Sequence, residues 1–163
     1  MAAWLVAALG LGGLLLLAER ARSPLDDPDP ARQRPGLLDL GALPAPAPQV
    51  TEQVPSLGRP AVIFFERPER LGRLCTALAR HRLARDAAAA IVVSGPGGRC
   101  ADPVVVVDPT RALQRRYGLP SPPDGGPAVG YAVVDAGGRI RYRTLDPTVA
   151  HNLAEVDTIV AAT

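Results

Sequence analysis

The chain has 163 residues and a mass of 17.0 kDa, a length typical of one domain. Its 18 basic and 16 acidic residues leave a formal charge of +2, so we expect no binding to nucleic acid. All the basic residues are arginine, which excludes a lysine Schiff base and the lysine of a phosphate-binding P-loop. With only two cysteines and two histidines, we expect no zinc site and no other cofactor.

The first segment of the chain is apolar. Residues Ala2–Ala18 carry no charge, and a helix of seventeen or eighteen residues here would span about 26–27 Å, close to the ~30 Å of a hydrocarbon core. A cleaved secretory signal is the alternative, but no basic region precedes the apolar run, and the polar stretch Glu19–Arg22 stands where a cleavage site would be needed. We therefore expect an uncleaved transmembrane anchor at residues 1–18, with residues 2–18 in the lipid bilayer.

The residues after the anchor suggest an orientation and a linker. Four arginines follow the apolar segment before residue 35, and the positive-inside rule would then place the rest of the chain in the cytoplasm. Residues 19–59 are rich in proline, which is typical of an extended tether. Residues 60–163 are left as one globular domain.

Strand and helix patterns alternate through residues 60–163. Short apolar runs predict buried strands, leucines at helical spacing predict the first helix, and a Gly-rich turn at 135–138 predicts a hairpin. We expect strands at 61–65, 89–94, 104–107, 131–134 and 139–144, and helices at 69–85, 110–117 and 148–161. This order indicates an α/β sheet that is parallel at first and antiparallel at one edge.

Two adjacent stretches carry a family resemblance. The sequence VVVVDPTRALQRRYGLP, followed by GYAVVDAGGRIRY, is similar to the strand, the helix ending in Tyr-Gly and the hairpin of the peroxiredoxin and redoxin branch (alkyl hydroperoxide reductase/thiol-specific antioxidant type) of the thioredoxin-like superfamily. The resemblance covers residues 60–163. It implies a thioredoxin-like three-layer α/β/α sandwich with a mixed sheet, preceded here by one transmembrane helix.

The family's active-site patterns match this chain only in part. The Cys-x-x-Cys pair of thioredoxins would fall on Arg70–Arg73, so the dithiol mechanism cannot run there. The peroxiredoxin pattern Pro-x-x-x-Thr-x-x-Cys fits at Pro68 and Cys75, with Gly72 in the threonine position. The family's arginine, and the cis-proline of thioredoxins, would fall on Val129. The resemblance thus makes Cys75 a candidate peroxidatic thiol, and burial as a small apolar residue is the alternative.

The second cysteine, Cys100, falls in the loop between the second and third predicted strands. Because that loop and the first helix both follow carboxyl ends of parallel strands, a Cys75–Cys100 bridge is geometrically possible. Such a bridge favours an oxidising compartment. The connection, about nine residues long, is short for a parallel crossover. Either residues 104–107 form an edge strand reached without a helix, or the fold is trimmed here.

Two functions remain open from the sequence. In the first, the chain is a cysteine-dependent oxidoreductase in which Cys75 attacks, Cys100 is its partner, and an external protein dithiol is the reductant, with no metal or nucleotide. In the second, it is a non-catalytic thioredoxin-like module that binds a membrane or envelope protein, and both cysteines are structural. Membrane-tethered redoxins usually face outward, which implies an extracytoplasmic domain, in conflict with the arginines that follow the anchor.

Overall fold

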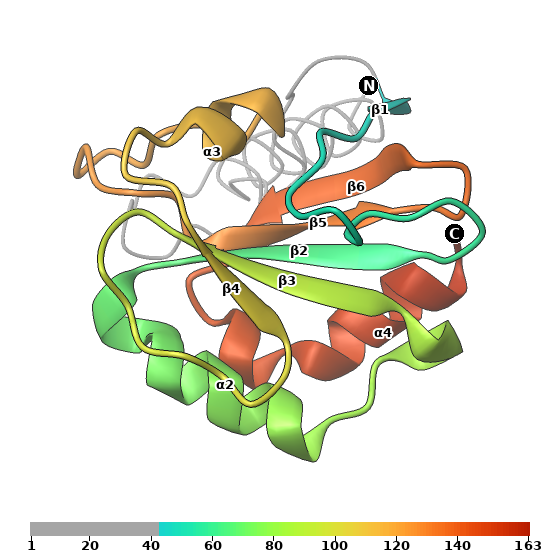
Figure 1. Ribbon diagram of the computed structural model, residues 1–163, viewed down its shortest axis with the longest axis horizontal. Helices are drawn as coiled ribbons and strands as arrows, with labels where there is room; N and C mark the ends of the chain where they lie inside the picture. The colour runs from blue at the N-terminus through green and yellow to red at the C-terminus, as the bar shows by residue number, and fades with distance from the viewer. Residues whose placement is uncertain (1–42) are drawn as a thin grey trace, which may run out of the picture. The chain divides into compact units, whose positions relative to one another are not determined.

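The computed structural model describes residues 43–163; the expected anchor at residues 1–18 and the expected linker up to residue 42 lie outside this range. Six strands form one sheet in the order β1-β6-β5-β2-β3-β4 (Figure 1). The strands are β1 (Ala45–Pro46), β2 (Ala61–Glu66), β3 (Ala88–Val93), β4 (Val104–Val107), β5 (Gly130–Val134) and β6 (Arg139–Leu145). Within residues 43–163, no helix is both long enough and apolar enough to cross a membrane.

The sheet is mixed, as the sequence predicts. Strands β2, β3 and β4 are parallel, whereas β5 runs antiparallel to β2 and β6 antiparallel to β5. Helices α2 (Leu71–Arg80) and α4 (Leu153–Ala161) cover one face, and the short α3 (Ala112–Arg116) lies on the other (Figure 1). Three layers result. This strand order, with its directions, confirms the expected thioredoxin-like α/β fold.

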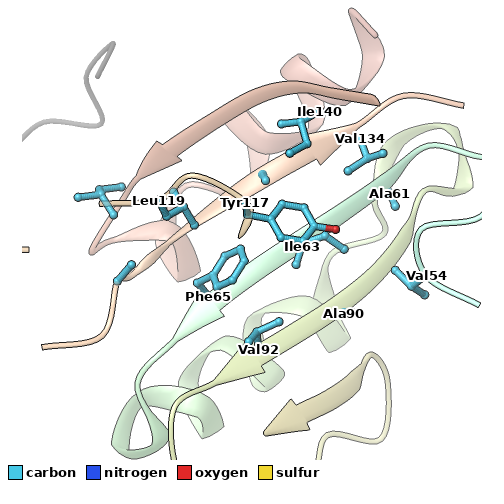
Figure 2. Packing of buried hydrophobic residues seen from close by; sticks show 13 residues of the cluster. Val54, Ala61, Ile63, Phe65, Ala90, Val92, Tyr117, Leu119, Val134 and Ile140 are labelled. Carbon is cyan, nitrogen blue, oxygen red and sulfur yellow. The ribbon is translucent and has the colours of Figure 1, made fainter. Parts of the chain in front are cut away.

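Each face of the sheet has its own core. Strand β2 is buried along its whole length, as a central strand covered on both faces should be. On the α3 face, the rings of Phe65 and Tyr117 meet edge to face with centroids 5.5 Å apart (Figure 2). On the other face, Phe64 and Leu74 are fully buried beneath α2 and α4. Side chains of β2 alternate between the two cores, so this one strand packs against the helices on both faces of the sheet.

Strand β4 is an edge strand, which is one of the two arrangements that the short connection before it allows. Among residues 43–163, strand β4 pairs only with β3 and ends the sheet, and the segment between β3 and β4 contains no helix. The expected strand at 104–107 is therefore confirmed, and it is reached by an extended loop. Val104 and Val107 are 48% and 52% exposed, unlike the buried residues of β2.

The first helix is shorter than the sequence predicts. A 3-10 turn (η2, Pro68–Arg70) leads into α2, which ends at Arg80, and His81 is extended instead of helical. The His81 ring bonds to Asp157 of α4, and the same carboxylate accepts the N–H of Ala84 at 2.8 Å. These contacts with α4 divert the chain before the helix can continue, a tertiary effect that leucine spacing does not reveal.

Asp157 should therefore stabilise the turn after α2. Replacing Asp157 by alanine leaves the Ala84 N–H and the His81 ring without their acceptor, and we expect a loss of about 1–2 kcal/mol in the free energy of unfolding. Urea denaturation at neutral pH measures it. Asp157→Asn retains the acceptor oxygen and should lose less; equal losses in the two variants would contradict this role.

The final helix also begins later than predicted. Residues Val149–His151 form a 3-10 turn (η4), and α4 starts only at Leu153. Between them, the Asn152 amide donates to Asp146 and to the Thr148 hydroxyl, at 3.2 and 3.0 Å. Side-chain hydrogen bonding of this kind competes with continuous helix.

Some residues before position 60 contact the sheet. Strand β1 pairs antiparallel with β6, and the Tyr117 hydroxyl donates to the Pro48 carbonyl at 2.6 Å. Val54 is buried in the core on the α3 face, and the Gly58 N–H bonds to the Ala136 carbonyl of the hairpin turn. Proline content alone predicts a tether here, because it does not report such tertiary contacts.

Candidate functional site

The first candidate residue, Cys75, lies on α2. Two buried leucines, Leu71 and Leu74, fix the helix on the sheet, and Cys75 follows them in a half-buried position. Cys75 is the fifth residue of α2 and lies beyond its first turn, where the unpaired N–H groups of the helix end. A thiolate here gains less from the helix dipole than one at the helix start.

The second candidate, Cys100, lies on the loop between β3 and β4, and the structure joins it to Cys75 in a disulfide. The two Cα atoms are 5.4 Å apart. Small residues let the loop approach α2 closely, because a Cβ at Gly97 would lie 3.1 Å from the Leu71 side chain. Both cysteines are half-buried and pack against the core beneath α2. The bridge that the sequence allows is thus present, and its sulfurs lie at the edge of the core.

The surroundings of Cys75 differ from the peroxiredoxin pattern as the sequence indicates. Gly72 is exposed with open space around its Cα, and Val129 is buried. The guanidinium of Arg70, five residues before Cys75, lies 3.4 Å from the Glu66 carboxylate and also donates to the Pro147 carbonyl. Arg70 is therefore committed to other partners.

Sequence reasoning missed a buried carboxylate at the end of β2. The Glu66 side chain is 1% exposed, and one of its oxygens accepts the Arg67 N–H at 2.9 Å. Burial raises the pKa of Glu66, while the Arg67 N–H and the Arg70 charge oppose that shift. The sequence feature that could have revealed it is the acidic residue at the end of an otherwise apolar strand, AVIFFE.

A small cavity adjoins Glu66 at the carboxyl ends of the parallel strands. Its volume is about 10 Å³, close to the room that one water molecule needs, and Phe65, Ser94, Asp108 and Gln114 contribute to its lining. Asp108 caps α3 by accepting the N–H groups of Ala112 and Leu113. The Asp108 carboxylate therefore serves structure, and at this volume the cavity is too small for an organic substrate.

A loop held by two arginines lies beside this cavity. Arg67 binds the exposed Asp124 carboxylate, and Arg111 donates to the carbonyls of Gly125 and Gly126 at 2.8 and 3.0 Å. The hydrogen bond from Arg67 lowers the pKa of Asp124. Both arginines thus position the loop that leads into β5. In the part of the chain that the structure describes, no three His, Cys, Asp or Glu side chains are grouped to hold a metal ion.

Glu66 should leave a signature in the pH dependence of stability. Because folding raises its pKa above the ordinary value of 4.5, the folded state keeps this proton to higher pH than the unfolded chain. Stability should therefore fall as pH rises from 4.5 through the raised pKa. We expect Glu66→Gln to remove this fall in stability with pH. At pH values above the raised pKa of Glu66, the variant should therefore be more stable than the wild type. Urea midpoints across the acidic and neutral range test this; parallel profiles would contradict it.

The strand order and the placement of both cysteines define an α/β domain with a thioredoxin-like strand arrangement and an internal disulfide. No family model matches the chain, and no curated protein matches it. Among solved structures, it is similar to the reduced 2-Cys peroxiredoxin of Plasmodium vivax, with 13% identity and a TM-score of 0.47 over 65% of this chain and 80% of that one.

Two further solved structures are similar to the chain. One is MTB DsbF in mixed oxidised and reduced forms, with 16% identity, a TM-score of 0.46, and 64% of this chain and 82% of that one covered. Another is the bacterioferritin comigratory protein of Xanthomonas campestris, with 17% identity, a TM-score of 0.44, and 65% and 80% covered. These are proteins that the chain resembles in fold.

Proposed function

We propose that this chain is a membrane-anchored thioredoxin-like redox protein whose Cys75–Cys100 disulfide is reduced and re-formed in turn. The observation that carries the proposal is the disulfide itself, which joins a helix to a loop and leaves both cysteines half-buried. A bridge between half-buried residues is open to attack by a thiolate. Residues 2–18 would anchor the chain, and the oxidised pair favours an extracytoplasmic position for the domain.

Reduction follows ordinary thiol–disulfide exchange. A thiolate of a protein dithiol attacks one sulfur of the bridge, forms a mixed disulfide and releases the other cysteine as a thiolate, which takes a proton. The second thiol of the reductant then displaces the remaining cysteine, so two electrons pass to this chain. With a peroxide as oxidant, the Cys75 thiolate takes one oxygen and releases an alcohol or water. Cys100 then attacks the sulfenic acid, and the disulfide forms with loss of water.

The experiment is a redox titration of the full chain in detergent micelles. The protein is equilibrated in defined ratios of reduced to oxidised dithiothreitol and glutathione, alkylated, and weighed by intact-mass spectrometry. We expect a cooperative two-electron transition, followed by peroxide-driven loss of two hydrogens from the reduced form.

Single substitutions provide the control. Cys75→Ser and Cys100→Ser should each abolish the two-electron transition, and only Cys100→Ser should accumulate a sulfenic acid on Cys75 under peroxide. A bridge that dithiothreitol reduces only after the protein is unfolded by urea would refute the redox proposal.

The position of Cys75 beyond the first turn of α2, with Arg70 committed to Glu66, favours a second candidate function. In it the domain is a binding module and the disulfide is structural. A resistant bridge in the titration would support that alternative.

A further inference from the structure

A large groove lies away from the Glu66 cavity, where the parallel strands begin. Its volume is about 870 Å³, within the range of ligand-binding clefts. Residues 78–83, at the end of α2 and just beyond it, form one wall, and residues 101–104 form the other. The start of β3 contributes the floor. Cys75, Cys100 and Glu66 are not among the residues that line this groove.

Small side chains explain why the groove is hollow. Five of the residues that line it are alanine, so the space that larger side chains would fill stays open. They are Ala79, Ala87, Ala88, Ala89 and Ala101. Leu78, Leu83 and Val104 make further parts of the lining apolar. The hollow therefore suits apolar side chains of a ligand.

The groove continues onto an unpaired sheet edge. Strand β4 has no strand partner on its outer side among residues 43–163, and its sequence of four valines contains none of the charges or prolines that usually protect an edge. Val104 belongs both to this edge and to the groove lining. An extended polypeptide can thus pair with β4 through its main chain while its side chains enter the groove.

The charged residues around the groove indicate which charge its ligand should carry. Three arginines, Arg59, Arg80 and Arg82, line the groove together with two aspartates. One of these, Asp86, is bound by Arg82 through its carboxylate and accepts a hydrogen bond from Arg59 at its main-chain carbonyl. Arg80 is exposed and has no ion-pair partner within residues 43–163. The rim is therefore net positive and favours acidic side chains.

We propose that this groove binds an extended segment of a partner polypeptide in which acidic and apolar side chains alternate. The apolar side chains lie over the alanine floor, and the acidic ones face Arg80 and Arg59. Cys75 precedes Leu78 on one wall and Cys100 precedes Ala101 on the other, so the disulfide ties the two walls together. The proposal concerns the oxidised protein and needs no thiol chemistry, so it stands independently of the proposed function.

The test uses the oxidised full chain in detergent micelles and a pool of short fluorescein-labelled peptides. In the pool, aspartate or glutamate alternates with valine, leucine, isoleucine or phenylalanine; a matched pool carries lysine in the acidic positions. Fluorescence anisotropy should show saturable binding of the acidic pool alone, displaced by unlabelled acidic peptides. Arg80→Glu should weaken it about tenfold, a change of about 1.4 kcal/mol.

Two further variants locate the binding. Ala101→Phe fills the groove from an exposed position and should abolish binding without unfolding the protein. Arg116→Glu makes the same charge change on α3, which lies across the sheet from α2 (Figure 1) and contributes no residue to the groove, and it should leave binding unchanged. No saturable binding, equal binding of the lysine pool, or binding that survives Ala101→Phe would overturn the proposal. Each of these results leaves the redox titration unaffected.

Discussion

Reduction of the Cys75–Cys100 bridge is expected to lower the free energy of unfolding by about 3 kcal/mol. The bridge closes a loop of 25 residues, and without it the unfolded chain gains the corresponding conformational entropy. In the folded state, the loop between β3 and β4 would then be held to α2 by noncovalent packing, as at the close approach of Gly97 to Leu71. Guanidinium denaturation with and without dithiothreitol measures this difference.

Variants separate the covalent bond from other effects of the cysteines. Cys75→Ala, Cys100→Ala and the double variant all lack the same bond, so their losses should be nearly equal and not additive. Each should also be insensitive to dithiothreitol. If the double variant loses about twice as much as either single variant, the stabilisation comes from side-chain packing and the loop-closure account is wrong.

The sheet could be predicted from the sequence because its signals are local. The apolar run at 61–65 and the turn at 135–138 place β2 and the hairpin directly, and no end of these strands differs from the prediction by more than one residue. The end of α2 could not be predicted, because it depends on a contact between residues far apart in the sequence. His81, just after the helix, bonds to Asp157, which lies 76 residues further along the chain. Strand β1 was missed for the same reason: its pairing with β6 is long-range.

The sequence predicted that the two cysteines could be bridged, and the structure shows the bridge. Parallel strands send the chain out at the same end of the sheet, so this topology places Cys75 and Cys100 near each other. The sequence could not show that Arg70 is committed to Glu66, because the fate of an arginine depends on which carboxylate is buried nearby. It also could not show the groove beside β4, which arises from alanines brought together by three separate segments.

Replacing Gly130 by alanine is expected to cause a comparably large loss of stability, about 4 kcal/mol. Gly130 begins β5, opposite Phe65 of β2 and Leu145 of β6. A Cβ at this position would lie 2.1 Å from the Thr144 carbonyl oxygen and 2.8 Å from the Leu145 Cα. These are backbone atoms of the neighbouring strand, so β5 and β6 would have to separate where the Asp146 N–H now bonds to the Val129 carbonyl.

Gly72→Ala is the matched control, because it adds the same methyl group where nothing lies within 4 Å. Gly72 lies on the exposed face of α2, and alanine there should stabilise the protein by about 0.5 kcal/mol through its higher helix propensity. Thermal unfolding of the two variants against the wild type should therefore shift the Tm in opposite directions. A Gly130→Ala protein as stable as the wild type would show that β5 and β6 have room for a side chain at this position.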